Sequence, residues 1–385
     1  MSKATTAPVF DVDTTLDTAR ILVCTGSGGV GKTTTAAALA LRAAERGRRT
    51  VVLTIDPAKR LAQSMGLSEL DNTPRAVAGL DTAKGGSLDA MMLDMKRTFD
   101  EIVETHAEPG KAEAIFANPF YQALSSSFAG TQEYMAMEKL GQLKATGDYD
   151  LIVVDTPPTR SALDFLDAPD RLTTFLDGRM VRILLAPAKA GGKAYFKVVS
   201  TGFNVFTSVI TRIIGAQVLQ DVSQFIGALE TMFGGFRERA QATYDLLKAD
   251  GTAFVVVAAP EPDALREAAY FVERLAQEQM PLAGLVVNRV HRSSSTLNVE
   301  RSLAAAESLE ESGGHAMASA VLRLHADRMA LAARERRLQD RFTGAHPDVP
   351  VTEVAALAGD VHDLDGLRAV GADLAGGAAA AAVPA

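Results

Sequence analysis

The chain has 385 residues and a formal net charge of -8, an acidic balance that argues against nucleic acid or an anionic membrane surface as the main partner. Cys24 is the only cysteine and the six histidines are scattered, so the sequence excludes an internal disulfide and a Cys-x-x-Cys zinc site.

The sequence predicts no signal peptide and no membrane-spanning helix. Its N-terminus lacks a basic region followed by an apolar run. The longest uncharged stretch in the apolar middle of the chain is 198–211, which is shorter than the about 20 residues that a spanning helix needs. We therefore expect a cytoplasmic protein that reaches a membrane only through a partner.

Six short apolar runs predict β-strands that are buried on both faces, because they lack the alternation of a strand with one exposed face. They are Ile21–Thr25, Thr50–Ile55, Asp150–Asp155, Ala253–Ala258, Gly284–Asn288 and Val349–Leu357. Helical patterns separate them, which is typical of a sheet covered by helices. The predicted fold class is α/β, with a doubly wound and mostly parallel sheet.

The predicted organisation starts with an N-terminal arm, residues 1–17, followed by one large domain, residues 18–370. Two intervals of this domain, about 85–145 and 160–250, show helical periodicity and almost no strand signal, so they predict an inserted helical subdomain. Apolar stripes at 203–214 and 219–236 fall in the second interval. The alanine- and glycine-rich segment 371–385 predicts a disordered tail.

Residues 26–33 follow the first strand and match the pattern G-x-x-x-x-G-K-[ST], a glycine-rich loop that holds phosphate. Glycines let backbone N–H groups approach phosphate oxygens, and the helix that follows adds its partial positive charge. Lys32 is expected to neutralise the β- and γ-phosphates of ATP, and the Thr33 hydroxyl to coordinate Mg²⁺. The predicted nucleotide-binding residues of this loop are Gly26, Ser27, Gly28, Gly29, Val30, Gly31, Lys32, Thr33 and Thr34.

Three stretches together resemble those of the arsenite-pump and tail-anchored-protein-targeting ATPase family. They are GGVGKT in the loop, TIDPAKRLAQSMG at 54–66 and VVDTPPTRSALDFLDAP at 153–169. The resemblance covers residues 18–370 and is strong at the phosphate motifs and loose in the helical inserts. It implies a P-loop NTPase of the SIMIBI class that acts as a dimer, with ATP and Mg²⁺ as cofactors.

The resemblance also assigns roles outside the loop. Asp56 would orient the attacking water beside the γ-phosphate, although an aspartate before a proline also suits a helix N-cap. Asp155 would hold a water on Mg²⁺, although it also suits a turn before Pro157. Asn288, in the run GLVVNR, would recognise adenine, although an asparagine after a strand is often only a turn residue.

Ser27 departs from the family pattern, in which a lysine at this position reaches across the dimer to the partner's nucleotide. A serine cannot supply that charge. Hydrolysis is then slow, or a paralogous partner supplies the lysine, or another cation replaces it, with Lys59, Arg60 and Arg160 as the candidates near the phosphate motifs.

Two functions follow as hypotheses. The first is a dimeric Mg²⁺-ATPase whose nucleotide state controls the capture and release of a hydrophobic client, such as a membrane-protein helix or a lipid-like molecule. The second is a weakly hydrolysing regulatory subunit that pairs with a paralogous ATPase. Ser27 favours the second hypothesis, whereas Asp56 and Asp155 favour the first.

Overall fold

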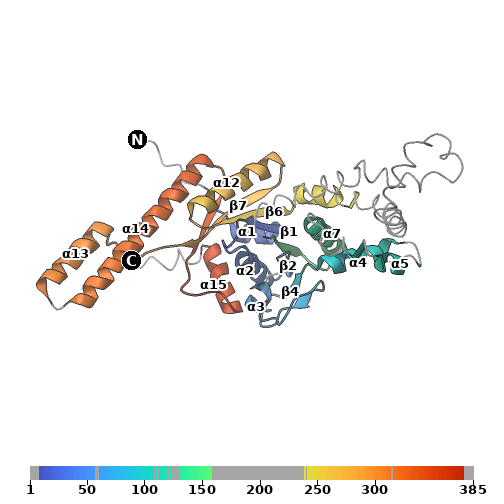
Figure 1. Ribbon diagram of the computed structural model, residues 1–385, viewed down its shortest axis with the longest axis horizontal. Coiled ribbons are helices and arrows are strands. Elements are labelled where there is room, and N and C mark those ends of the chain that lie inside the picture. The colour runs from blue at the N-terminus through green and yellow to red at the C-terminus, as the bar shows by residue number, and fades with distance from the viewer. Residues whose placement is uncertain are drawn as a thin grey trace, which may run out of the picture. The chain divides into compact units, whose positions relative to one another are not determined.

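A computed structural model describes residues 8–56, 60–107, 110, 112–118, 121–122, 131–157, 238–239, 241–313 and 315–376 (Figure 1). The chain divides into two compact units. The described part of the first comprises residues 8–92, without 57–59, then 147–157, and 247–376, without 314. That of the second lies within 93–146 and 238–246.

The first unit is built around an eight-stranded, mostly parallel sheet with the order β3-β4-β2-β5-β1-β6-β7-β8. Only the pairing of β3 with β4 is antiparallel. The strands are β1 (Ile21–Gly26), β2 (Arg49–Thr54), β3 (Arg75–Ala76), β4 (Ser87–Met92), β5 (Leu151–Asp155), β6 (Thr252–Ala258), β7 (Leu282–Val290) and β8 (Val351–Ala355).

The order of the strands brings three carboxyl ends side by side. β5 lies between β1 and β2, with Asp155 in register with Cys24 on one side and with Thr54 on the other. Because these strands are parallel, the residues that follow them emerge at the same edge of the sheet, where α/β proteins place their ligands.

The fold class is confirmed, and so are the six predicted strands, with small shifts at their ends. The expectation that residues 85–145 lack strands is wrong at its start, because β4 occupies Ser87–Met92 and pairs with β2. Asp89 interrupts the apolar run of this strand, so the pattern does not show a buried strand. Its carboxylate accepts a hydrogen bond from the Tyr149 hydroxyl at 2.7 Å.

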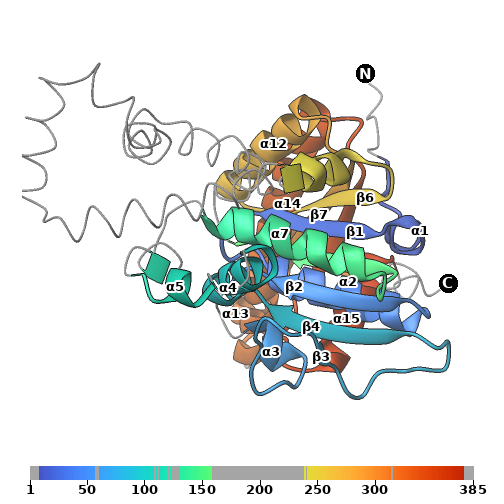
Figure 2. The same cartoon turned by 90° about the vertical axis from the view of Figure 1, so that its right-hand side faces the viewer.

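Seven helices of the described residues belong to the first unit. They are α1 (Val12–Thr18), α2 (Lys32–Glu45), α3 (Arg60–Ser64), α12 (Pro262–Gln277), α13 (Val299–Ser312), α14 (Ala316–Ala345) and α15 (Leu364–Leu374). Helix α2 lies alongside β1, β2 and β4, as Figure 2 shows, and it also packs against α15. Its alanines and leucines join Leu22 and Cys24 of β1 in one buried cluster, so the helix that starts at the glycine-rich loop is anchored along its length.

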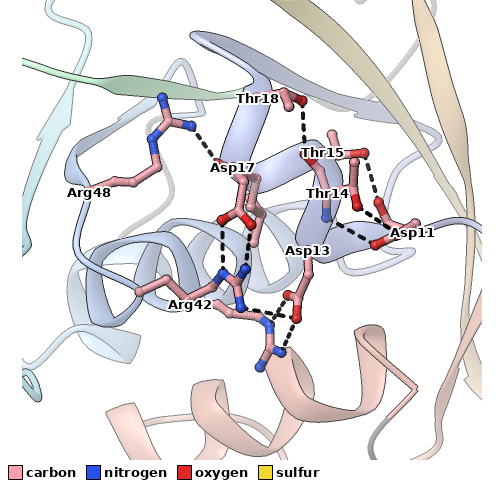
Figure 3. A network of polar contacts seen from close by, with 10 residues as sticks. Asp11, Asp13, Thr14, Thr15, Asp17, Thr18, Arg42 and Arg48 are labelled. Atoms are coloured by element: carbon pink, nitrogen blue, oxygen red, sulfur yellow. Dashed lines mark hydrogen bonds and ion pairs between the residues drawn. The ribbon is translucent and has the colours of Figure 1, made fainter. Parts of the chain in front are cut away.

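The predicted N-terminal arm includes α1, which ion pairs attach to α2 (Figure 3). The Asp13 carboxylate accepts two hydrogen bonds from Arg42, at 2.6 and 2.8 Å, and Asp17 pairs with Arg46 at 2.6 Å. Asp11 caps the helix by accepting a hydrogen bond from the Thr14 N–H at 3.0 Å. These contacts fix the segment that leads into β1.

The prediction that the disordered tail begins at residue 371 is wrong at its start, because α15 extends to Leu374. Asp373 is buried and accepts hydrogen bonds from Arg292 Nη1 at 2.8 Å and from the Ala355 N–H at 2.6 Å. The Thr352 hydroxyl also donates to the Leu374 carbonyl at 3.1 Å. Composition alone does not show these contacts. Residues 377–385 lie outside the described residues.

The described part of the second unit is helical and contains α4 (Met95–His106), α5 (Ala112–Phe116) and α7 (Thr131–Thr146). Lys139 on α7 pairs with Glu101 on α4 at 3.0 Å. The apolar stripes predicted at 203–214 and 219–236 lie outside the described residues. Among the described residues, no helix combines the length and the apolar character needed to cross a bilayer.

Candidate nucleotide-binding site

The loop between β1 and α2 depends on glycines at both of its ends. Gly26 and Gly31 have backbone φ angles of 147° and 95°, in the region that residues with side chains disfavour. A Cβ on Gly26 would lie 2.1 Å from the Val257 carbonyl oxygen, and one on Gly31 would lie 2.3 Å from Nδ2 of Asn288. The loop therefore runs against its neighbours by backbone alone and keeps the glycine-rich surface that phosphate binding needs.

The rest of the loop has the exposure that a ligand site requires. Gly28 and Gly29 are exposed, and Val30 is buried below them. Ser27 and, on the first turn of α2, Thr33 and Thr34 are half-buried.

Lys32, the first residue of α2, is only 6% exposed. Its Nζ donates a hydrogen bond to the Ser27 carbonyl at 2.8 Å, so the ammonium group is held under the loop. Burial lowers the pKa of Lys32, and the nearby carboxylates of Asp155 and Asp56 act in the opposite direction. The same burial strengthens the attraction of this cation for an anionic ligand.

Asp155, the last residue of β5, is fully buried. Its Oδ2 accepts a hydrogen bond from the Thr54 hydroxyl at 2.9 Å, whereas Oδ1 has no hydrogen-bond partner among the described residues. Burial raises the pKa of Asp155 from 3.8 to about 6, although the Thr33 and Thr54 hydroxyls and the Lys32 charge lower it.

The unpartnered oxygen of Asp155 is the observation that tests whether Mg²⁺ fits this site. A buried carboxylate oxygen without a donor is costly, and such groups rarely lack a partner. Mg²⁺ binds oxygen ligands and usually keeps several waters, which donate hydrogen bonds to nearby carboxylates. The Thr33 hydroxyl and the Asp155 carboxylate therefore form a set that fits a hydrated magnesium ion.

Asp56 is half-buried and follows the end of β2. This strand is the neighbour of β5, which ends at Asp155. The backbone N–H of Asp56 donates to the Thr54 hydroxyl oxygen at 3.2 Å, and the Asp56 charge contributes to the raised pKa of Asp155. The segment that follows, 57–59, lies outside the described residues, as does 158–160, so Lys59 and Arg160 are not placed. Arg60, the third candidate cation, is exposed at the start of α3.

Asn288 lies near the carboxyl end of β7 and contacts the glycine-rich loop directly. Its Nδ2 donates to the Val30 carbonyl at 2.8 Å, and its Oδ1 accepts from the Arg289 N–H at 3.0 Å. Arg289 has a φ angle of 66°, at an irregularity in the pairing of β7 with β8. The side chain thus stands beside the phosphate loop, and its recognition of adenine remains a prediction.

Thr54 also belongs to the site, although it was not among the predicted residues: its hydroxyl donates to Asp155, and its oxygen accepts from the Asp56 N–H. The alternation of side chains along a strand contains a signal for it. Thr54 is the last residue of β2 and lies two positions before Asp56, and in an extended chain side chains two positions apart face the same side.

Comparisons with known proteins show to which family the chain belongs. Residues 19–312 match the model of a family described as anion-transporting ATPase. An ATPase named ARSA2 from Chlamydomonas reinhardtii is 29% identical over 275 residues, covering 69% of this chain and 66% of that protein. An ATPase named GET3 from Malassezia globosa is 32% identical over 151 residues, covering 39% of this chain and 43% of that protein.

The alignments therefore span 66% and 43% of the lengths of these two relatives. A further ATPase of the name get3, from Pyrenophora tritici-repentis, is 26% identical over 277 residues, covering 71% of this chain and 74% of that protein. The family match covers well over half of the chain and includes the glycine-rich loop, Asp56, Asp155 and Asn288. This protein is thus a member of the anion-transporting ATPase family.

Proposed function

We propose that the protein is a Mg²⁺-dependent ATPase whose nucleotide state controls the binding and release of a hydrophobic client. The observation that carries this proposal is the meeting of Lys32, Asp155 and Asp56 at neighbouring strand ends beside the glycine-rich loop. A structural ion pair alone does not account for it, because Asp155 keeps one buried oxygen that no described group satisfies.

Each residue has a role that follows from its position. The loop amides and the Lys32 ammonium bind the phosphates, and Thr33 with Asp155 would hold the magnesium ion. When bound, that ion neutralises charge on the β- and γ-phosphates. Asp56, half-buried and close to this charge, is the candidate base that orients the attacking water. Asn288 is the candidate contact for adenine.

The switch follows from where these carboxylates lie in the chain. Asp56 directly precedes the segment 57–59, and Asp155 lies three residues before the segment 158–169, so contacts with the γ-phosphate would bias the conformations of both. The second segment leads into the interval 160–250 whose apolar stripes motivate the client hypothesis. We propose a membrane-protein helix or a lipid-like molecule as the client. We further propose a cytoplasmic location and a dimer, either of identical chains or with a paralogue.

The second candidate function is a weakly hydrolysing regulatory subunit, and Ser27 is the observation that favours it. Its side chain carries no charge, and its carbonyl is engaged by Lys32 at 2.8 Å. By analogy with arginine fingers, loss of a transition-state cation costs about 10³-fold or more in rate.

Single-turnover hydrolysis of ATP by the purified chain distinguishes the two functions. For the ATPase, Asp56→Asn is expected to lower the rate by about 10²-fold or more while ATP binding is retained. Lys32→Ala is the matched control and is expected to abolish binding. If wild type and Asp56→Asn bind ATP and are equally inert, the chain is the regulatory subunit. If wild type does not bind Mg²⁺ and ATP, both proposals fail.

The variant Ser27→Lys tests the missing cation directly. Because Lys32 uses the backbone carbonyl of residue 27, the substitution leaves that hydrogen bond possible. We expect a faster single turnover that depends on protein concentration, since the new lysine acts across a dimer. An unchanged rate would argue that the missing lysine does not limit hydrolysis.

A further inference from the structure

One asparagine side chain joins the end of β7 to the glycine-rich loop. Nδ2 of Asn288 donates a hydrogen bond to the Val30 carbonyl at 2.8 Å, across 258 positions of the sequence. The same nitrogen lies 2.3 Å from the place that a Cβ on Gly31 would occupy. The amide is therefore packed directly against the loop.

The backbone of the next residue fixes which way this amide faces. The Arg289 N–H donates a hydrogen bond to Oδ1 of Asn288 at 3.0 Å. An N–H group can only donate and a carbonyl oxygen can only accept, so the two partners together assign the oxygen and the nitrogen of the amide. Asn288 is thereby held at its oxygen by β7 and presents its nitrogen to the loop.

Arg289 has a strained backbone at this point. Its φ angle is 66°, a left-handed value that residues with side chains seldom adopt, and it coincides with the irregularity in the pairing of β7 with β8. Gln279, the other such residue in the described part of the chain, follows the C-terminus of α12, where this conformation is common. Arg289 ends no helix. Its bulge turns a backbone N–H onto the Asn288 side chain, and bulges of this kind re-aim side chains next to active sites.

The contact with the Val30 carbonyl also sets the direction of a donor. That carbonyl and the Gly31 N–H belong to one planar trans peptide, in which the C=O and N–H bonds point in opposite directions. The Gly31 N–H therefore points away from Asn288. Because loops that hold phosphate do so with N–H groups turned toward the anion, fixing one side of this peptide fixes a candidate phosphate donor on the other side.

A second carbonyl of the loop is held in a similar way, by a different kind of group. Nζ of Lys32 donates to the Ser27 carbonyl at 2.8 Å. The Lys32 ammonium is also the charge expected to bind the phosphates, so its bond to the loop competes with that task. The Asn288 amide is neutral, and its bond to the loop does not compete with phosphate binding.

We propose that Asn288 is a positioning residue for the phosphates. Its amide, held by the backbone of Arg289, sets the orientation of the loop peptide between Val30 and Gly31. This role is separate from recognition of adenine by the same side chain. An asparagine amide has two N–H groups and two oxygen lone pairs, and these contacts use one of each, so it retains one of each for a base. The inference rests on the proposed function, because it requires the loop to bind a polyphosphate.

Inorganic tripolyphosphate distinguishes the two roles, because it offers the phosphates of ATP without adenine. Isothermal titration calorimetry of the full chain with Mg²⁺ measures the affinities for tripolyphosphate and for ATP. Asn288→Ala removes the amide without adding a charge near the phosphates. We expect this variant to bind both ligands about 10-fold more weakly than wild type, since the loss concerns the phosphates that they share. A larger loss for ATP than for tripolyphosphate would add adenine recognition to the positioning role.

Asn298→Ala is the matched control. The Asn298 side chain accepts a hydrogen bond from the Arg301 N–H at 2.9 Å and caps α13, so its loss lowers stability without changing a contact of the loop. We expect this variant to bind tripolyphosphate as wild type does. Urea denaturation without ligand checks that each variant is folded. Asn288→Ser, whose hydroxyl is too short to reach the Val30 carbonyl, is expected to show the same loss as Asn288→Ala and replaces it if the alanine variant does not fold.

The inference is overturned if Asn288→Ala binds tripolyphosphate as tightly as wild type, whatever its affinity for ATP. An equal loss in Asn298→Ala would also overturn it, since the effect would then follow from lower stability. If wild type binds ATP but not tripolyphosphate, the loop does not hold phosphate through its own amides and the inference fails. If wild type binds neither ligand, the proposed function itself fails.

Discussion

The Asp155→Asn substitution probes the electrostatics of the site in the absence of nucleotide and metal. Asp155 is fully buried, and burial raises its pKa from 3.8 to about 6. Between these two values the folded protein keeps the proton that the unfolded chain releases. The contribution of this group to stability is therefore fully present below about pH 4 and is lost as the pH rises through about 6.

The size of the effect follows from the shift. A displacement of roughly two pKa units, at 1.36 kcal/mol per unit, corresponds to about 3 kcal/mol in the free energy of unfolding. Asparagine has a similar shape, is always neutral, and can still accept the hydrogen bond from Thr54. The free energy of unfolding of Asp155→Asn, relative to that of wild type, should therefore increase by about 3 kcal/mol between pH 4 and pH 7.

Urea denaturation in the presence of a chelator, followed by far-UV circular dichroism, measures this change, since the chain has no tryptophan to report by fluorescence. Titration of the groups that do not interact with Asp155 cancels in the difference between the two proteins at each pH. A difference that stays constant from pH 4 to pH 7 would refute the assignment of the raised pKa to Asp155. Binding of Mg²⁺ and ATP by wild type should also weaken below about pH 6, as the carboxyl becomes protonated.

Two further substitutions test the scaffold of the site. Gly31→Ala combines an unfavourable φ of 95° with a Cβ 2.3 Å from Asn288 Nδ2, so we expect a loss of about 2–4 kcal/mol in chemical denaturation. Gly29→Ala, with a φ of 77° and open space around its Cβ, should lose only the conformational part, and equal losses would show that the contact is unimportant. Asp13→Asn removes a two-point ion pair with Arg42 at 2.6 and 2.8 Å. We expect about 1 kcal/mol lower stability at pH 7 and a difference that shrinks in acid, where Asp13 of the wild type also loses its charge; a difference independent of pH would contradict this reasoning.

The sheet was largely predictable because its strands are buried on both faces. In β5 every residue from Leu151 to Asp155 is buried, and such a run contains its own signal. β4 lacks that signal because Asp89 interrupts its apolar run. The carboxylate of Asp89 accepts a hydrogen bond from Tyr149, which is 60 residues away in the sequence. The helical end of α15 was missed for the same reason, since Asp373 is held by Arg292, 81 residues away. Contacts between distant residues decide burial in both places, and a local pattern does not contain them.

The candidate site shows the same division. The pattern of the glycine-rich loop and the positions of Asp56 and Asp155 after strands were enough to predict that they meet, because parallel neighbouring strands end at one edge. The hydrogen bond between Asn288 and the Val30 carbonyl was not predictable, since it joins residues 258 positions apart. The same Asn288 side chain would clash with a Cβ on Gly31, which gives a physical reason for the glycine that the motif requires at this position.

Helix α14 extends this argument from the site to the surface. Its coiled-coil spacing is visible in the sequence from Met317 to Phe342, yet the spacing is the same in the half that is buried and in the half that is exposed. The two halves differ in their contacts with the rest of the unit: α12 packs against α14, and the N–H of His291 donates a hydrogen bond to Glu335 in the C-terminal half.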